Sequence, residues 1–506
     1  MDHHGVSLMA SETVIQGFPV AQGGPRPSEG PGRRDASSFD DVPSRLEGNR
    51  EPLSHGYRVQ DQGITRAFRP SQSLTQLATA PGVESPAREW MVAAALYGLM
   101  LVFGVREGGF WHADAFVALL ASLVCLVVAL IANRTDRRSA MVLISVLALA
   151  FWWLVRAATS GSITGFLPLG SSIVAFAAAF AAVRPLQRRA REVAGLGVAC
   201  LGAAGAVVGF AGLIWRWYPM AMPAQGLWRL SSTLTYSDAA GLALGVCLLL
   251  ALGSDAYPWL TRIVVCLCAG GLLATQSRGA YVAFACACAI VPWRRYVQFL
   301  IPLLAGAALG IAAIVSSPNA GPVARLGVVL VLALCLTAVA RSNVPSLSVH
   351  KTGRVVFGLV LLSSAAGAFL LVRHELTLRV FAPSDQDRSV EWSAAFHQWM
   401  SAPLLGVGPD RLLVFHAIDG NMAHFVHNEY LQLAADSGVI GLMLLALSIG
   451  CVARVVRRAD VLTSCATAAL VCWSVAAVFD FDWHLTFIGF LGGWCLGLAH
   501  QKERLT

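Results

Sequence analysis

Charged side chains are scarce in this sequence, since Asp, Glu, Lys and Arg make up 13% of its 506 residues. Soluble domains carry about 25%. Lysine is nearly missing, with Lys351 and Lys502 as its two examples. This composition excludes an ordinary water-soluble domain. It also indicates that the net charge of +8 reports membrane orientation and not nucleic-acid binding.

Cysteine is missing from the polar connections. All 12 cysteines lie in apolar stretches, from Cys125 to Cys495. Cysteine there behaves as a small hydrophobic residue, and the pair Cys286 and Cys288 lacks the further ligands of a metal site. We therefore expect no disulfide framework and no zinc site. A sequence repeat of fixed period is also missing.

Long apolar runs dominate what is present. Runs of about 17–22 residues match a hydrocarbon core of roughly 30 Å, and mean hydropathy is +0.63. The sequence predicts an all-α polytopic membrane protein with about 12–14 transmembrane helices. The candidate spans are 89–105, 113–131, 140–156, 165–183, 193–214, 236–253, 259–275, 278–291, 297–315, 323–340, 354–373, 428–450, 461–479 and 485–500. The short spans 259–275 and 278–291 could instead form one hairpin or a re-entrant pair.

The N-terminal segment 1–88 differs from the rest, because it is rich in Pro, Gly, Ser and charge. Such a composition cannot bury enough apolar surface to fold, so we expect a disordered cytoplasmic tail. The transmembrane domain follows at 89–500, and 501–506 form the C-terminus.

Arginine distribution orients the predicted helices. Cytoplasmic connections of membrane proteins are enriched in Lys and Arg, and alternate connections here carry such clusters. Both termini are then cytoplasmic, and the long loop 374–427 lies outside the membrane on the opposite face. The basic connections are 133–138, 184–191, 293–296, 351–354, 454–458 and 501–504.

A polar block within residues 388–442 interrupts the apolar pattern. Spacing of apolar residues over 389–400 predicts an amphipathic helix lying on the outer leaflet. The following G-V-G-P at 406–409 is typical of a turn. It is a weak candidate for a phosphate loop, because the further glycines of such loops are missing.

Four segments resemble the O-antigen ligase and polymerase family of bacterial envelope glycan transferases. They are R-L-S-S-T-L-T-Y-S-D-A-A-G-L-A-L (229–244), L-L-A-T-Q-S-R-G-A-Y-V-A (272–283), the R-x3-W…P-L-L-G-V-G loop from Arg388 through Gly408, and H-N-E-Y-L-Q-L-A-A-D-S-G-V-I-G-L (427–442). The resemblance covers roughly residues 89–500. Asp238 and Asp436 depart from it, since family members often have Asn and Glu there.

The resemblance implies a catalytic set of His427, Arg278 and Arg388. Arginine suits a diphosphate clamp because its planar fork binds phosphate oxygens bidentately, and an imidazole is the usual general base. The alternatives are an Arg278 that reaches lipid head groups, an Arg388 in a surface ion pair with Asp385 or Asp387, and a His427 that only packs at the interface. Further expected substrate-binding residues are Arg229, Tyr236, His424, Asn428, Tyr430 and Asp482.

The implied activity is metal-independent, inverting transfer of a glycan from a polyprenyl-diphosphate carrier to an acceptor hydroxyl, at the outer face of the cytoplasmic membrane. No cofactor and no nucleic acid are expected, and the partners are the lipid-linked donor, a glycan, lipid or polymer acceptor, and membrane lipids. Two other classes stay open, a lipid-linked glycan flippase or exporter and a non-catalytic envelope-assembly protein. A flippase of this size should show two related halves.

Overall fold

The computed structural model describes residues 86–224, 227–315, 322–341, 385–412, 414–415, 422–456 and 458–500. The expected N-terminal tail lies outside these residues, except that the first helix already begins at Pro86. The candidate span 354–373 and the clusters at 351–354 and 501–504 also lie outside them.

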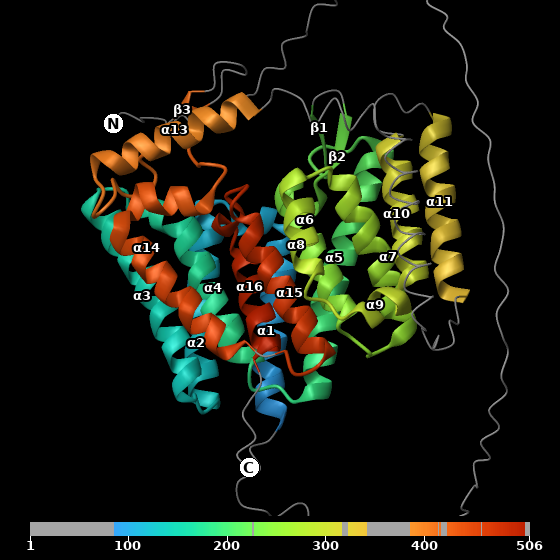
Figure 1. The fold of residues 1–506 in the computed structure, drawn as a ribbon, viewed down its shortest axis with the longest axis horizontal. Helices are drawn as coiled ribbons and strands as arrows, with labels where there is room; N and C mark the ends of the chain where they lie inside the picture. Colours follow the sequence, from blue (N-terminus) through green and yellow to red (C-terminus); the bar gives the residue numbers. More distant parts are fainter. Residues whose placement is uncertain are drawn as a thin grey trace, which may run out of the picture. The chain divides into compact units, whose positions relative to one another are not determined.

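Helices dominate the described chain and confirm the all-α membrane fold (Figure 1). Their bounds follow the apolar runs closely. The helices are α1 Pro86–Val105, α2 His112–Ala132, α3 Arg137–Thr159, α4 Leu167–Val183, α5 Arg188–Trp215, α6 Ser237–Leu252, α7 Pro258–Thr275, α8 Arg278–Cys288, α9 Trp293–Gln298, α10 Leu300–Val315, α11 Pro322–Arg341, α13 Asp385–Ser401, α14 Glu429–Val455, α15 Val461–Ala476 and α16 Thr486–Ala499. Two small antiparallel pairs join them, β1 Ala221–Ala224 with β2 Leu227–Leu230, and β3 Val414–Phe415 with β4 Met422–Ala423.

Within the described residues, six helices of at least 18 residues are long and apolar enough to cross a membrane, and six shorter apolar helices accompany them. Large apolar side chains of α2, among them Val117, Val124 and Ile131, are exposed, as expected for a surface in contact with lipid. Helix α8 has 11 residues and is about 16 Å long. It is too short to cross a core of roughly 30 Å alone, which favours the re-entrant alternative for this segment.

Close contact between backbones holds α16 against α4. A Cβ at Gly489 or Gly493 of α16 would overlap the backbone of Ser172 or Phe176 on α4. Small residues permit such approach between membrane helices, and Ser171 and Thr486 add a hydrogen bond of 2.7 Å between the same two helices.

The arginine-rich connections meet at one end of the helices. Arg184 pairs with Asp136 at 3.6 Å, and Arg191 donates to the carbonyl groups of Leu498 and His500. His500 in turn bridges to Val456. The connections 133–138, 184–191 and 454–458, which the sequence assigns to one membrane face, therefore do lie together.

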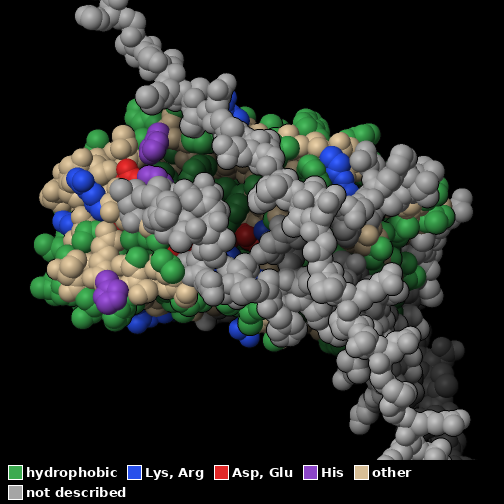
Figure 2. Space-filling model, turned by 90° about the horizontal axis from the view of Figure 1, so that it is seen from above, with side chains coloured by type: hydrophobic (Ala, Val, Ile, Leu, Met, Phe, Trp, Pro, Cys, Tyr) green, Lys and Arg blue, Asp and Glu red, His purple; other side chains and the backbone are tan. Residues whose placement is uncertain are grey.

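The opposite end gathers the polar and aromatic connections. Arg411 donates to the carbonyl of Ser160, and the rings of Phe110 and Phe425 lie 5.8 Å apart. Figure 2 looks onto the side of α13 and β1, where His, acidic and basic side chains appear among hydrophobic ones. The helix expected over 389–400 is α13, which begins three residues before Arg388 and packs on α14 (Figure 1).

The P-L-L-G-V-G stretch is fastened to a kink in α14. Gly406 and Gly438 both have positive φ, 71° and 65°. The Val407 and Gly408 amides donate to the carbonyls of Ala435 and Asp436, and Val439 donates back to Pro403. A Cβ on Gly406 would overlap the backbone of Asp436 and Ser437. This glycine clasp, Gly406 against Gly438 with the bonds around them, fixes the end of α13 to α14.

Candidate functional site

His427 and Glu391 form the closest pair of ionisable groups in the site. Nδ1 of His427 lies 2.7 Å from Oε2 of Glu391, and the backbone N–H of His427 donates to the same oxygen at 3.0 Å. Glu391 is fully buried and His427 is partly exposed. With Glu391 ionised, Nδ1 carries the hydrogen, so the lone pair of Nε2 is left for a substrate proton.

Helix α13 supplies both this acid and an arginine. Glu391 and Arg388 are three residues apart, so they lie on the same helix face. Arg388 reaches Asp480 at 3.8 Å, and Tyr236 donates its hydroxyl to the same carboxylate at 2.8 Å. The structure therefore brings Arg388, Tyr236 and His427 to one place, as the sequence predicts.

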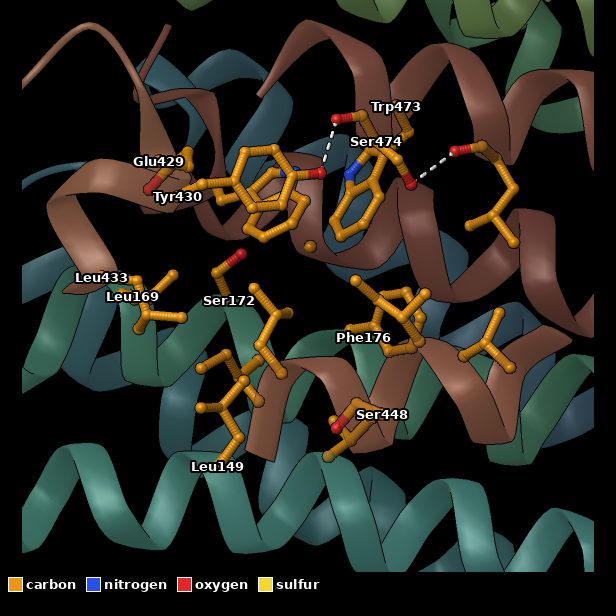
Figure 3. Close-up of a pocket in the computed structure, with 18 residues that line it drawn as sticks. Leu149, Leu169, Ser172, Phe176, Glu429, Tyr430, Leu433, Ser448, Trp473 and Ser474 are labelled. Atoms are coloured by element: carbon orange, nitrogen blue, oxygen red, sulfur yellow. Dashed lines mark hydrogen bonds between the residues drawn. The ribbon is translucent and has the colours of Figure 1, made fainter. Parts of the chain in front are cut away.

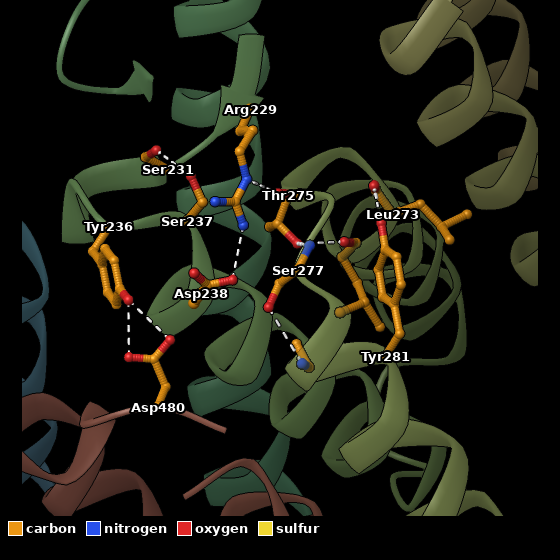
Figure 4. A network of polar contacts seen from close by, with 12 residues as sticks. Arg229, Ser231, Tyr236, Ser237, Asp238, Leu273, Thr275, Ser277, Tyr281 and Asp480 are labelled. Carbon is orange, nitrogen blue, oxygen red and sulfur yellow. Dashed lines mark hydrogen bonds and ion pairs between the residues drawn. The ribbon is translucent and has the colours of Figure 1, made fainter. Parts of the chain in front are cut away.

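Arg229 belongs to the same network of polar contacts as Tyr236 and Asp480 (Figure 4). Its guanidinium pairs with Asp238 at 2.8 Å and donates to the carbonyl of Thr275 at 2.9 Å. Both Arg229 and Asp238 are largely buried. The strand pair β1–β2 carries Arg229 to the start of α6, where Asp238 lies in the first turn.

Arg278 is the first residue of α8 and is half-buried. Ser277 before it caps the helix by accepting from the Ala280 amide. Ser277 also lines a small pocket together with Arg388, Asp480 and Asp482. The chain thus places Arg278 beside the pocket that Arg388 enters.

A cavity of about 590 Å³ adjoins His427. Tyr236, His424 and His427, all expected in the site, line it. His424 is half-exposed and its Nδ1 lies 3.7 Å from Asp410. Further lining residues are Phe110, Trp111, His112, Trp153, Phe425, Asp436, Phe481 and His484.

A second histidine–carboxylate pair is formed by His484, which lines this cavity, and Glu429. Nδ1 of His484 is 3.1 Å from Oε1 of Glu429, and both side chains are buried. The ring of Phe425 packs on His484 at 4.5 Å, while Phe481 packs on His427 at 5.3 Å. Phe425 and Phe481 stack on each other and so separate the two imidazoles.

Three of the expected substrate-binding residues have clear structural contacts. Asn428 caps α14 by accepting from the Leu431 amide. Tyr430 donates to the Ser474 carbonyl at 2.8 Å and lines an apolar cavity of about 140 Å³ (Figure 3). Asp482 is buried beside Arg388 in the small pocket. These contacts of Asn428 and Tyr430 fasten the first turn of α14.

The local fields shift several pKa values. Burial lowers the pKa of His427, but the hydrogen bond to Glu391 and the charge of Asp480 outweigh it, so this pKa lies above its ordinary value. Burial raises the pKa of Asp480 to about 6, against the opposing effects of His427 and Arg388. Burial and the neighbouring Asp480 raise the pKa of Asp482 well above its usual range. Shifts of this kind are common where protons are exchanged in catalysis.

Sequence reasoning missed Glu391 and Trp153 as neighbours of the candidate site, and it did not pair His484 with Glu429. Glu391 stood inside an amphipathic helix among other polar residues, and its partner is 36 residues away. Within the described part of the chain, no group of three or more His, Cys, Asp or Glu is arranged to hold a metal ion.

These features define an integral membrane protein with a polar, histidine-bearing site at one end of its helices. Residues 263–446 match the family model described as O-antigen ligase. This confirms the resemblance to the O-antigen ligase and polymerase family, and it supports a glycan ligase or polymerase type of activity. The match includes Arg278, Arg388 and His427, whereas Arg229, Tyr236 and Asp482 lie outside it. No curated protein matches the chain.

Proposed function

We propose that the protein transfers a glycan from a polyprenyl-diphosphate carrier to an acceptor hydroxyl, with inversion and without a metal ion. The observation that carries this proposal is the His427–Glu391 pair beside Arg388. His427, held by the buried carboxylate of Glu391, lines a cavity of about 590 Å³, and Arg388 lies three residues from Glu391 on the same helix and lines the adjoining small pocket with Asp480.

In the proposed reaction, the acceptor hydroxyl gives its proton to Nε2 of His427 as its oxygen bonds to the anomeric carbon. The bond from that carbon to the diphosphate oxygen breaks, and the lipid diphosphate leaves with the electron pair. Arg388 and Arg278 stabilise the negative charge that grows on the diphosphate, which is the electrostatic role such donors have in transferases. Attack opposite the leaving group inverts the anomeric centre.

Glu391 acts by orienting the imidazole, and Asp480 acts by orienting Arg388. The Tyr236 hydroxyl lies 2.8 and 2.9 Å from the two carboxylate oxygens of Asp480 and holds this side chain in place. Arg229 is committed to Asp238 and Thr275. Its role in this scheme is to fix the start of α6 and to contribute positive charge near the diphosphate.

Orientation in the membrane is part of the proposal. The arginine-rich end, with Arg184 and Arg191, faces the cytoplasm, and the His427 end faces outward. A donor whose lipid is embedded in the outer leaflet then presents its diphosphate at the level of Arg388.

The test is transfer from a polyprenyl-diphosphate glycan by the purified full chain with EDTA present. His427→Ala should abolish transfer, and His397→Ala, which changes an exposed histidine of α13, should leave it intact. Full activity of His427→Ala would remove the general-base role. Loss of activity in EDTA that a divalent metal restores would replace the arginine clamp with a metal mechanism.

A further inference from the structure

Helix α13 turns large apolar side chains away from the protein. Its small residue Ala395 is buried, in a cluster that is separate from the main core and includes Leu412, Val414, Val426 and Ala435. Trp392 and Phe396 are by contrast 38% and 48% exposed. Neighbouring exposed apolar side chains of this size commonly mark a contact with lipid or with another protein.

The exposed rings lie on one side of α13. Trp392, Phe396 and Trp399 are spaced by four and three residues, so they follow one another along the helix, and the rings of Phe396 and Trp399 lie 6.0 Å apart. His397 is also exposed and lies about 100° around the helix axis from Phe396, with Met400 between them. Helix α13 therefore has an aromatic side, formed by Trp392, Phe396 and Trp399, and a polar side at His397 with Met400 at the edge between the two.

The polar atoms of the aromatic side are already bonded to the chain. Nε1 of Trp392 donates to the carbonyl of His427 at 3.2 Å, and Nε1 of Trp399 donates to the carbonyl of Pro403 at 3.3 Å. An indole has this single N–H to donate and no acceptor. What the two indoles turn outward is therefore C–H surface, which suits hydrocarbon better than water. Tryptophan is also enriched where membrane proteins cross the lipid–water boundary.

The chain after α13 joins the lipid-facing surface of α14. The amide of Ile440 donates to the carbonyl of Leu404 at 3.4 Å, and the Leu404 side chain is exposed. Ile440, Met443 and Leu447 share one face of this long apolar helix and are all exposed. Val455, at the arginine-rich end of α14, is 15 residues beyond Ile440, or about 23 Å along the helix. A hydrocarbon core is roughly 30 Å thick, so Leu404 lies within its depth and α13 lies at its edge.

Helix α13 also holds the proposed general base. Trp392 binds the carbonyl of His427, while Glu391 accepts from its N–H and lies 2.7 Å from its Nδ1. Arg388 reaches Asp480 from the same helix. Whatever fixes α13 therefore fixes both the backbone and the ring of His427, together with the guanidinium of Arg388.

We propose that the aromatic side of α13 is embedded in the membrane leaflet at the His427 end, among phospholipid acyl chains, and that this lipid contact positions His427 for transfer. The continuous apolar surface from α13 through Leu404 to Ile440 is the reason for choosing lipid over a protein partner. The effect on transfer rests on the proposed function, whereas the lipid contact itself does not.

Spin labels at two neighbouring positions test the lipid contact. Phe396→Cys or His397→Cys is introduced into a variant lacking the exposed Cys286, which also gives the background. The labelled full chain is studied in phospholipid nanodiscs by power-saturation EPR, with oxygen, which concentrates in lipid, and a nickel chelate, which stays in water. The label at 396 should collide more with oxygen and the label at 397 more with the chelate. Equal accessibility of the two labels, or protection of 396 from both reagents as a protein partner would give, overturns the lipid contact.

Phe396→Glu and His397→Glu test the effect on His427. The first variant places a charge in the lipid contact, and the second places the same charge on the polar side of α13. Burial lowers the pKa of His427 and the hydrogen bond to Glu391 raises it, so loosening α13 should move the acid limb of the transfer rate to lower pH. Phe396→Glu should show this shift and a several-fold lower kcat, and His397→Glu should show neither. An unchanged kcat and acid limb in Phe396→Glu would disprove the coupling to His427.

Trp392→Phe tests the direct link, because it keeps an aromatic ring in the lipid contact and removes the N–H that holds the His427 carbonyl. It should lower kcat several-fold. Trp399→Phe removes the N–H that bonds Pro403 and should cost less, so equal rates for the two variants would remove Trp392 as a positioning residue. Failure of the proposed function has a different signature, since the wild-type protein would then consume no lipid-linked donor while the spin labels still decide the lipid contact.

Discussion

Glu391 holds His427 at two points, because one carboxylate oxygen accepts from the backbone N–H and lies 2.7 Å from the imidazole Nδ1. Glu391 is fully buried in α13, while His427 precedes α14. The contact therefore fixes both the ring and the chain that carries it. It also makes the basicity of Nε2 depend on a residue of a different helix.

Glu391→Gln should shift the acid limb of the transfer rate to lower pH. Gln keeps an oxygen that can accept the same hydrogen bonds but loses the charge, which is one of the causes that raise the pKa of His427. A lower pKa leaves the imidazole neutral to more acidic pH but makes it a weaker base. We expect kcat to fall by about tenfold or more. A pH–rate profile compares wild type and variant, with Glu192→Gln at the arginine-rich end as control; an unmoved acid limb would assign Glu391 a purely structural role.

Arg388→Lys should impair transfer although it conserves charge. An ammonium group cannot reproduce the planar fork on a diphosphate, and loss of such a donor costs on the order of 10²-fold in rate. Arg278→Lys should show a comparable loss, since both arginines lie in helices, α8 and α13, that hold their backbones in place. Steady-state kinetics with the lipid-linked donor measure both. Arg137→Lys at the opposite end is the control, and wild-type rates in both site variants would contradict the clamp.

Gly438→Ala should destabilise the protein and Gly450→Ala should not, although both lie in α14. Gly438 has φ of 65° and a Cβ there would overlap the Leu404 carbonyl, whereas nothing lies within 4 Å of a Cβ at Gly450. Strain of this kind costs about 1–3 kcal/mol, while Gly→Ala in a regular helix is favourable by up to about 1 kcal/mol. Thermal unfolding in detergent compares the two. Equal midpoints would show that the glycine clasp relaxes without cost.

An added cysteine at Met400 should react with a membrane-impermeant maleimide on intact cells, and one at Arg137 should not. Both positions are exposed at opposite ends of the helices. This expectation follows from the enrichment of arginine at the Arg137 end of the helices, because cytoplasmic connections carry more Lys and Arg. Most of the 12 native cysteines are buried or partly buried, and a variant lacking the exposed Cys286 gives the background. Labelling at position 137 but not at position 400 would show that the proposed membrane orientation is reversed.

The sequence predicts the helices well and the site only in part, for physical reasons. A transmembrane helix such as α2 is set by a local apolar run that the bilayer requires, so its bounds can be read directly. His427 and Arg388 could be recognised from their motifs. The pairing of His427 with Glu391, and of His484 with Glu429, depends on how distant segments pack, and spacing along the chain carries no signal for it.

Trp153 and Asp436 illustrate a further limit. From the sequence alone, Trp153 is interpreted as a packing residue of an apolar helix, and Asp436 as a departure from the family's usual Glu. Their shared cavity becomes visible once α3 lies against α14, which the Trp152 bond to the Ser437 carbonyl helps to hold at 3.1 Å.

The glycine clasp bears on how this chain tolerates mutation. Gly406 and Gly438 are constrained by neighbouring backbone, whereas the side chains of Leu404 and Leu405 between Pro403 and the clasp are exposed. In a saturation-mutagenesis screen the two glycines would reject every side chain, while Leu404 and Leu405 would accept many apolar ones. The glycine of the P-L-L-G-V-G stretch at position 406 is thus required by close backbone packing. A chain could therefore keep this glycine even if it had lost His427 and its chemistry.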